Sequence, residues 1–258
     1  MASIGIYDSG LGGLSVLRAV RQALPRHDLG YLADTAFCPY GPRPVAEVQA
    51  RACACTGWLI DQGAGVVVVA CNTATSAALE LLRAEFTVPI VGMEPGVKPA
   101  IQATRNGQVG VLATDGTLAG TRFAALVKRF AVGVAVHTVP CPGLVAQVEA
   151  GDLSGPATRQ LLARYLAPLQ MRGVDTIVLG CTHFPFLAPV IAELVGPDVT
   201  IIDTGLPVAR QVARVAAMVE LPTGSSRLRC ATTGNPTYVA PVMHRLLYAD
   251  VPLEHADC

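Results

Sequence analysis

Two cysteines stand at equivalent places in the sequence, each directly after a short aliphatic run. Cys71 follows residues 66–70, and Cys181 follows residues 177–180. Each run is typical of a buried strand and precedes a helical stretch, so exposed amides and the helix dipole are expected to favour the thiolate. Two equivalent thiols suit inversion at a carbon acid, because one removes the α-proton from one face while the other protonates the opposite face. A cysteine hydrolase needs only one such thiol.

Polar residues beside these thiols can assist them. His183 lies two residues after Cys181, close enough in sequence to orient or activate the thiol. Cys-x-His spacing also occurs in metal sites, but no second pair of ligands stands nearby, so no metal is expected. Asn72 and Thr73 follow Cys71 and can hold a polar substrate. The alternative is that Cys71 is a small buried hydrophobe and Thr73 a helix cap.

A glycine-rich segment, Asp8-Ser9-Gly10-Leu11-Gly12-Gly13, follows a predicted strand at residues 4–7. Its glycines permit a tight turn and a close approach of the backbone to a ligand. The segment lacks the Gly-Lys-Ser/Thr of a phosphate-binding loop and the spacing of a dinucleotide fingerprint, so neither ligand is expected. A purely structural turn is the alternative.

Proton abstraction from an amino acid is often assisted by pyridoxal phosphate, which is held by a lysine. The sequence contains two lysines, Lys98 and Lys128. Lys128 lies in a helical stretch far from the motifs above, and Lys98 is expected to face solvent. We therefore expect catalysis without a cofactor.

An α/β framework must position these residues. Short aliphatic runs predict strands at residues 4–7, 29–32, 66–70, 90–93, 109–113, 134–139, 177–180, 201–203 and 229–232. Longer amphipathic stretches predict helices at residues 14–24, 45–62, 74–85, 120–130, 156–171, 185–194 and 206–219. The alternation is typical of parallel sheets flanked by helices, whose ligands bind at the carboxyl ends of the strands.

An internal repeat links the two thiols. Three segments match three later ones in the same order and at a nearly constant offset: residues 4–6 with 109–111, 67–73 with 177–183, and 89–91 with 200–202. The repeat predicts two similar α/β halves with one cysteine in each. Chance likeness between parallel strands is the alternative.

Composition narrows the class of protein. The chain has 258 residues, of which 52% are hydrophobic and 15% charged, which suits a globular protein of one large or two ordinary domains. Lys+Arg and Asp+Glu both number 19 and are scattered, so nucleic acid is not expected as a primary partner. The longest aliphatic run is too short to span a bilayer, and the start of the chain has no leader pattern. We expect a soluble cytoplasmic protein without a membrane partner, whose eight cysteines stay reduced.

Six short motifs are spread along nearly the whole chain: Asp8-Ser9-Gly10-Leu11-Gly12-Gly13-Leu14-Ser15, Pro39-Tyr40-Gly41, Cys71-Asn72-Thr73-Ala74, Glu94-Pro95-Gly96, Glu149-Ala150-Gly151 and Gly180-Cys181-Thr182-His183. Together and in this order they resemble the motifs of the bacterial glutamate racemases, in the aspartate/glutamate racemase superfamily. The combination is far more specific than any one motif.

The resemblance implies two pseudo-symmetric, doubly wound parallel-sheet domains with the active site in the cleft between them. Residues 1–95 and 208–258 would form the first domain, and residues 96–207 the second. The implied activity is cofactor-independent racemisation of glutamate by two cysteines, supplying D-glutamate for peptidoglycan. A homodimer and a small-molecule substrate are also implied.

The resemblance also implies roles for individual residues. Cys71 would work on the α-proton of the D-enantiomer, with Asp8 close by. Cys181 would work on that of the L-enantiomer, assisted by His183 and Glu149. The family's substrate-contacting positions correspond to Asp8, Ser9, Tyr40, Gly41, Asn72, Thr73, Thr182 and His183. Backbone amides and hydroxyls in such loops can hold carboxylates without an arginine.

Several features leave alternatives open. Tyr40 and Gly41 could form an ordinary turn, and Glu149 could be an exposed helix residue. Phe184 stands where the family commonly has Tyr, and residues 117–121 lack the family's usual Ser, so Thr117 and Thr121 are not predicted site residues. An aspartate racemase or another superfamily member is the nearest alternative function. A non-catalytic binding or inhibitory protein on the same fold is the alternative from another class.

Overall fold

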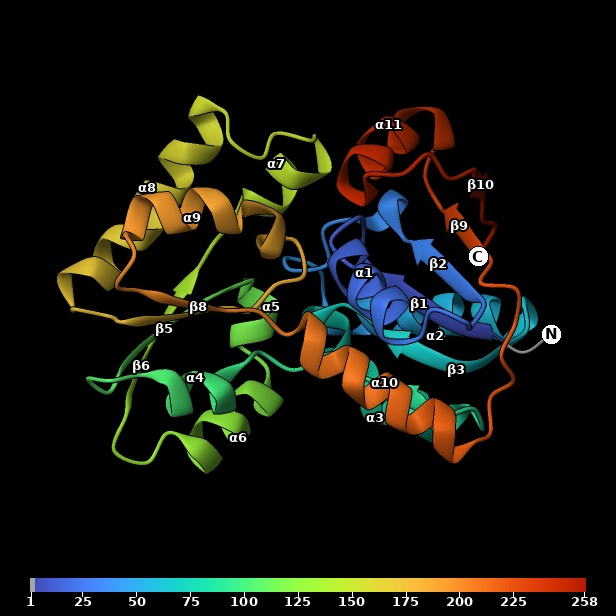
Figure 1. Cartoon of the computed structure of the whole chain (residues 1–258), viewed down its shortest axis with the longest axis horizontal. Coiled ribbons are helices and arrows are strands. Elements are labelled where there is room, and N and C mark those ends of the chain that lie inside the picture. The colour runs from blue at the N-terminus through green and yellow to red at the C-terminus, as the bar shows by residue number, and fades with distance from the viewer. Residues whose placement is uncertain (1–2) are drawn as a thin grey trace.

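The computed structural model describes residues 3–258, so the first two residues of the predicted segment 1–95 lie outside the described part of the chain. Two bodies lie side by side, each built on a parallel sheet (Figure 1). The predicted fold class, α/β with two doubly wound parallel sheets, is confirmed.

The larger sheet has the strand order β10-β9-β2-β1-β3-β4. Its strands are β1 (Ser3–Asp8), β2 (Leu29–Ala33), β3 (Ala64–Val69), β4 (Ile90–Val91), β9 (Leu228–Thr232) and β10 (Leu253–His255). The smaller sheet has the order β6-β5-β7-β8, from β5 (Gln108–Ala113), β6 (Ala135–Pro140), β7 (Thr176–Leu179) and β8 (Thr200–Ile202). The order β2-β1-β3-β4 matches β6-β5-β7-β8, so the internal repeat read from the sequence is a repeat of structure.

Helices cover both faces of each sheet because successive strand residues point to opposite faces. Apolar residues of β1 such as Ile4 and Ile6 pack toward α1 (Leu14–Ala23), α10 (Gly205–Met218) and α11 (Pro236–Leu247). The opposite face packs on α2 (Val45–Asp61) and α3 (Asn72–Glu85). In the smaller sheet, α7 (Leu144–Glu149), α8 (Pro156–Met171) and α9 (Ala188–Val195) cover one face, and α4 (Val97–Ala103) and α6 (Thr121–Phe130) the other.

The chain passes between the two bodies twice. It leaves the larger sheet after β4 and enters the smaller one through α4. After β8 it returns, and α10 packs against α1 and against β3 and β4 (Figure 1). None of the helices within residues 3–258 has both the length and the apolar character needed to cross a membrane.

Most predicted elements are present, and the exceptions have local causes. The strand predicted at 90–93 is only two residues long, and the helix predicted at 185–194 is divided into the 3-10 turn η2 (Phe184–Leu187) and α9. The elements α4, α5 (Asp115–Leu118), α7 and β10 were not predicted because each is too short to show a period. Helix α11 was also missed, and it contains Pro241, a residue that disfavours helix interiors.

Candidate active site

The loops that follow the carboxyl ends of β1, β2, β3, β5 and β7, together with the start of α7, enclose a small polar cavity. Its lining is Ser9, Pro39, Tyr40, Gly41, Cys71, Asn72, Thr73, Thr114, Thr117, Val145, Cys181, Thr182 and His183. Nine of the eleven predicted site residues are in this set, and the other two, Asp8 and Glu149, lie directly behind it. The cavity volume of about 10 Å³ is on the order of a single water.

Cys71 is held by the start of α3. It is the N-cap of that helix, and its Sγ accepts the N–H of Ala74 at 3.5 Å and lies 3.7 Å from Oγ of Ser9. Burial and, next, the carboxylate of Asp8 raise the pKa of the Cys71 thiol well above its ordinary value. The Ala74 N–H at the helix start lowers the pKa of this thiol, as expected, but burial acts more strongly in the opposite direction.

Asp8 is fully buried at the tip of β1. Its carboxylate accepts the N–H of Gly13 at 2.8 Å and the hydroxyl of Thr182 at 3.4 Å, so it touches the loops of both sheets. Burial raises the pKa of Asp8 from 3.8 to about 6, although His183 and the Gly13 N–H act in the opposite direction. This carboxyl group therefore changes protonation close to neutral pH.

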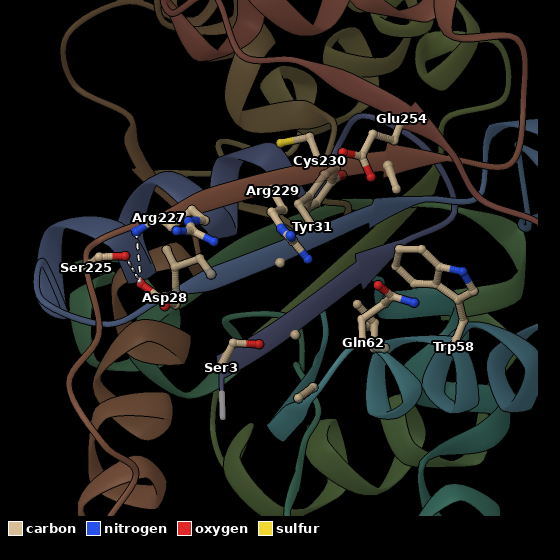
Figure 2. Close-up of a pocket in the computed structure, with 16 residues that line it drawn as sticks. Ser3, Asp28, Tyr31, Trp58, Gln62, Ser225, Arg227, Arg229, Cys230 and Glu254 are labelled. Atoms are coloured by element: carbon tan, nitrogen blue, oxygen red, sulfur yellow. Dashed lines mark hydrogen bonds between the residues drawn. The ribbon is translucent and has the colours of Figure 1, made fainter. Parts of the chain in front are cut away.

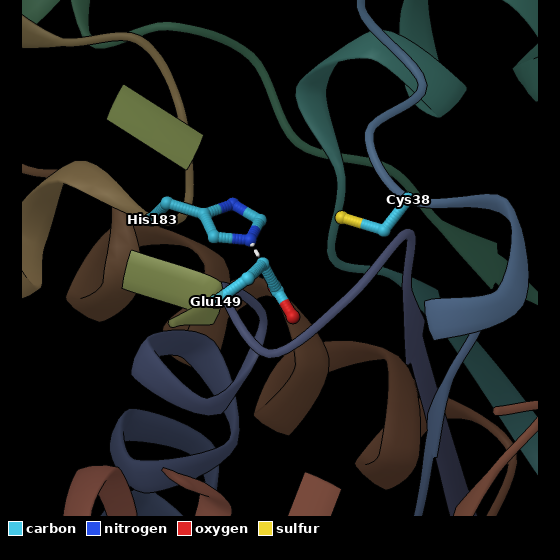
Figure 3. Close-up of side chains that lie close together, drawn as sticks. All are labelled: Cys38, Glu149 and His183. Carbon is cyan, nitrogen blue, oxygen red and sulfur yellow. Dashed lines mark hydrogen bonds and ion pairs between the residues drawn. The ribbon is translucent and has the colours of Figure 1, made fainter. Parts of the chain in front are cut away.

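Cys181 begins a chain of polar contacts. Its Sγ lies 3.7 Å from Nδ1 of His183, and Nε2 of His183 lies 2.6 Å from Oε1 of Glu149 (Figure 3). Burial alone would lower the pKa of His183, but contacts with Cys181, Cys38 and Glu149 raise it well above its ordinary value. Glu149 ends α7 and is half-buried, so it is not the ordinary exposed helix residue of the alternative reading.

The backbone of the glycine-rich loop after β1 contacts both Glu149 and His183. The N–H of Leu11 donates to Glu149 at 2.6 Å, and the backbone nitrogen of Gly12 lies 3.2 Å from Nε2 of His183. A Cβ atom at Gly12 would lie 2.2 Å from the His183 ring, so a side chain there cannot be accommodated. The glycines thus allow the backbone of the larger body to approach His183 and Glu149 of the smaller one, so the segment is more than a turn.

Tyr40 and Asn72 both line the cavity but differ in their hydrogen bonding. The hydroxyl of Tyr40 donates to Asp34, which also pairs with Arg51 at 2.8 Å, so this phenol is already engaged away from the cavity. The amide of Asn72 is buried, and neither its nitrogen nor its oxygen has a hydrogen-bond partner within residues 3–258. An unpaired buried amide costs on the order of 1–3 kcal/mol, a cost that a polar ligand would remove.

Two further threonines, Thr114 and Thr117, also line the cavity. Thr114 was not considered from the sequence, and Thr117 was considered there but left out of the predicted site residues. Oγ1 of Thr114 lies 2.9 Å from that of Thr73 and 3.0 Å from that of Thr117. Thr114 directly follows β5, the counterpart of β1 in the repeat, so the strand-end rule that identified Asp8 also points to it. Phe184 packs into the core beside Cys181, where a ring without a hydroxyl is suited.

A larger pocket of about 320 Å³ lies at the other end of the larger sheet. Figure 2 shows its lining, which includes Ser3, Trp58, Arg229 and Glu254. It contains the amino ends of β1 and β2, whereas ligands of open α/β sheets bind at the carboxyl ends. The small cavity with both thiols is therefore the candidate active site.

Basic side chains are not part of the candidate site. Among the described residues, the cavity lining contains no Arg or Lys. Lys98 is exposed and lies over the ring of Phe130, and Lys128 is exposed on α6. Carboxylate groups of a ligand would therefore meet amides and hydroxyls rather than guanidinium or ammonium groups.

Comparisons with known proteins identify the family of this chain. The family model described as Asp/Glu/Hydantoin racemase matches residues 12–212. A glutamate racemase of Pseudomonas aeruginosa is 55% identical over 215 residues, which cover 83% of this chain and 81% of the relative. The structure of a Bacillus anthracis glutamate racemase isoform superposes with a TM-score of 0.90 at 32% identity, covering 99% of this chain and 97% of that one.

A second solved structure is similar to the same extent. It is an Escherichia coli glutamate racemase in complex with L-glutamate and an activator, with a TM-score of 0.88 and 32% identity. The superposition covers 99% of this chain and 98% of that one. With a family model matched over most of its length and relatives this similar, the chain belongs to the Asp/Glu/hydantoin racemase family.

Proposed function

We propose that this chain is a glutamate racemase that interconverts the L- and D-enantiomers with two cysteines and no cofactor. The observation that carries the proposal is that Cys71 and Cys181 line one polar cavity from equivalent strand ends of two similar sheets. Relatives named glutamate racemase, and a similar structure that contains L-glutamate, support glutamate as the substrate.

The reaction requires each thiol in a different protonation state. For the D-enantiomer, the Cys71 thiolate removes the α-proton, and the C–H electron pair remains on the α-carbon. The Cys181 thiol then delivers its proton to the opposite face, which gives the L-enantiomer and a Cys181 thiolate. The reverse reaction starts from the Cys181 thiolate. Proton exchange between the two groups restores the starting state.

The surrounding groups hold and move these protons. Asp8 is near Cys71 and titrates near pH 6, so it can accept the proton of that thiol. His183 and Glu149 serve the Cys181 thiol in the same way. Burial opposes a Cys71 thiolate, and the ammonium group of a bound amino acid would offset this by placing a positive charge in the cavity.

Amides and hydroxyls are proposed to bind the substrate carboxylates. The first N–H groups of α3 have no partner within the helix, and the unpaired amide of Asn72 adds a further polar group. Ser9, Thr73 and Thr182 supply hydroxyls, and Tyr40 and Gly41 contribute backbone. Glutamate is much larger than the cavity, so binding requires the two halves to separate.

This separation suggests the domain division. We propose that residues 1–95 and 208–258 form one domain and residues 96–207 the other, each carrying one of the two sheets. The two crossings of the chain would then act as the hinge. A homodimer is part of the proposal on the basis of family resemblance alone.

The test is incubation with L-glutamate, D-glutamate or L-aspartate in D₂O without added cofactor, following optical rotation and deuterium at the α-carbon. Racemisation with deuterium incorporation is expected for glutamate. Exchange with aspartate alone would make the protein an aspartate racemase, and no exchange with any substrate would favour a binding protein. Rescue of a D-glutamate-requiring bacterium by the gene would test the supply of D-glutamate for peptidoglycan.

A further inference from the structure

A third thiol lies beside the residues that serve Cys181. Among the described residues, Sγ of Cys38, a ring nitrogen of His183 and a carboxylate oxygen of Glu149 all lie within 4.8 Å of one another. Figure 3 shows the Cys38 thiol directed toward the other two side chains. The three come from separate segments: the loop after η1 (Thr35–Phe37), the end of α7, and the loop after β7.

We propose that Cys38, His183 and Glu149 bind a zinc ion that inhibits the enzyme. The proposal that zinc inhibits rests on the proposed function, in which His183 and Glu149 serve Cys181. The existence of the binding site itself does not depend on racemase activity.

The donor set suits zinc. Thiolate, imidazole and carboxylate are its usual protein ligands, and the presence of sulfur and nitrogen disfavours magnesium and calcium. Tetrahedral bond lengths of about 2.0–2.3 Å place donor atoms about 3.3–3.6 Å apart. Donors already within 4.8 Å therefore need only small movements. A fourth position is left for water or a substrate carboxylate.

A zinc ion can reach the proposed site from solvent, and its binding requires only local movements of the donor side chains. Cys38 and Glu149 are only half-buried, so an ion can enter from the solvent side. The ion would take the place of the proton between Nε2 of His183 and Oε1 of Glu149, whose separation of 2.6 Å must widen. The backbone nitrogen of Gly12, 3.2 Å from Nε2, would have to move away from the ion. The thiol proton of Cys38 is released at the same time.

Inhibition is expected because the ion would occupy Nε2 of His183. With zinc on Nε2, the imidazole can no longer carry a proton between Glu149 and Cys181. Each direction of the reaction uses both thiols, so loss of this relay stops both directions. Zinc is therefore expected to reduce conversion of the L- and D-enantiomers equally.

The test uses chelator-treated full-length protein titrated with zinc chloride in the presence of a zinc-competing dye, with racemisation measured on the same samples. A single zinc per chain is expected, with activity falling in parallel and returning on addition of chelator. In Cys38→Ala, zinc affinity should fall by at least about tenfold, while activity without zinc persists. Cys53→Ala is the matched control, since Cys53 is half-buried on α2 and contacts Glu85, outside the site.

Cobalt chloride gives a readout that does not depend on activity. Bound Co²⁺ should show tetrahedral absorption bands and a thiolate-to-metal band that disappears in Cys38→Ala. Circular dichroism checks folding, and Cys38→Ser is the second variant if the alanine variant is unstable. Equal metal binding in the wild type and in both Cys38 variants would overturn the site. Cys38-dependent binding in a protein that never racemises glutamate would support the site and refute the proposed function.

Discussion

The two thiols occupy equivalent positions but have different surroundings. The hydrogen-bond and carboxylate neighbours of Cys71 all belong to the larger body: Asp8 at the end of β1, Ser9 after it, and Ala74 at the start of α3. From the smaller body, Cys181 also acts to raise its pKa. Cys181 contacts His183 of its own loop, and His183 contacts Glu149 of the same body. The backbone nitrogen of Gly12, from the larger body, also lies close to His183. The first thiol is thus surrounded mainly by burial and the charge of Asp8, whereas the relay of the second lies within the smaller body and is contacted by backbone nitrogens of the larger one.

A structural repeat therefore need not repeat its chemistry. The strand order fixes where both thiols stand, whereas their proton partners differ in type and origin. The equilibrium constant between enantiomers is one, so kcat/KM must be equal in the two directions for every variant. A difference between the two thiols is therefore sought in isotope effects with each α-deuterated enantiomer and in kcat and KM taken separately.

The largest effect is expected from removing either thiol. Cys71→Ala and Cys181→Ala should each reduce racemisation by at least about 10³-fold, because the reaction lacks a base in one direction and an acid in the other. Optical rotation measures the loss. Cys230→Ala, a buried cysteine of β9 outside the cavity, should retain activity. Substantial activity in either of the first two variants would contradict the two-thiol mechanism.

Asp8→Asn tests the local control of Cys71. Activity should fall on the order of 10²-fold or more, and the loss of wild-type kcat/KM below about pH 6 should disappear. The primary isotope effect with α-deuterated D-glutamate should rise more than that with the L-enantiomer. An equal rise for both enantiomers would show that Asp8 does not serve one thiol specifically.

The same variant should affect stability with a defined sign. The pKa of Asp8 is raised in the folded protein, so its contribution to stability is present at low pH and is lost as pH rises from 3.8 through about 6. Asp8→Asn should therefore be more stable than the wild type above pH 6, by about 2–3 kcal/mol, and similar to it below about pH 4. Urea unfolding at both pH values measures this. A variant less stable than the wild type at pH 8 would contradict the buried charge.

Glu149→Gln tests the relay of Cys181. The amide keeps the size of the side chain but cannot accept a proton, so activity should fall about 10- to 100-fold. The isotope effect should now rise more with α-deuterated L-glutamate, the reverse of Asp8→Asn. Glu193→Gln, an exposed variant on α9, serves as the control. The same bias in both Asp8→Asn and Glu149→Gln would remove the distinction between the two thiols.

The smallest effect is expected from Thr114→Val, which removes one hydroxyl of the threonine group and keeps the side-chain shape. A single hydrogen bond is worth about 1 kcal/mol, so KM should rise about fivefold with little change in kcat. Steady-state kinetics in both directions measure the change. A large loss of kcat instead would place Thr114 in the proton-transfer steps rather than in binding.

Much of the fold followed from the sequence. The spacing of hydrophobic residues predicted nine of the strands, because strands depend on short-range patterns. The internal repeat predicted that Cys71 and Cys181 occupy equivalent positions. Short elements such as α7 and β10 were not predicted, because a few residues are too few to show a hydrophobic period. The resemblance suggested Glu149, but its 2.6 Å contact with His183 depends on how α7 packs.

The sequence by itself determined which residues stand at the strand ends, including both thiols, Asp8 and the glycines that follow it. Only the tertiary structure decided that Cys38 lies near His183 and Glu149, that the Tyr40 hydroxyl donates to Asp34, and that burial raises the pKa of the Cys71 thiol. Strand ends follow from local alternation of side chains, which any parallel sheet imposes. Contacts between distant loops and the burial of charge depend on the packing of two bodies, which no local pattern encodes.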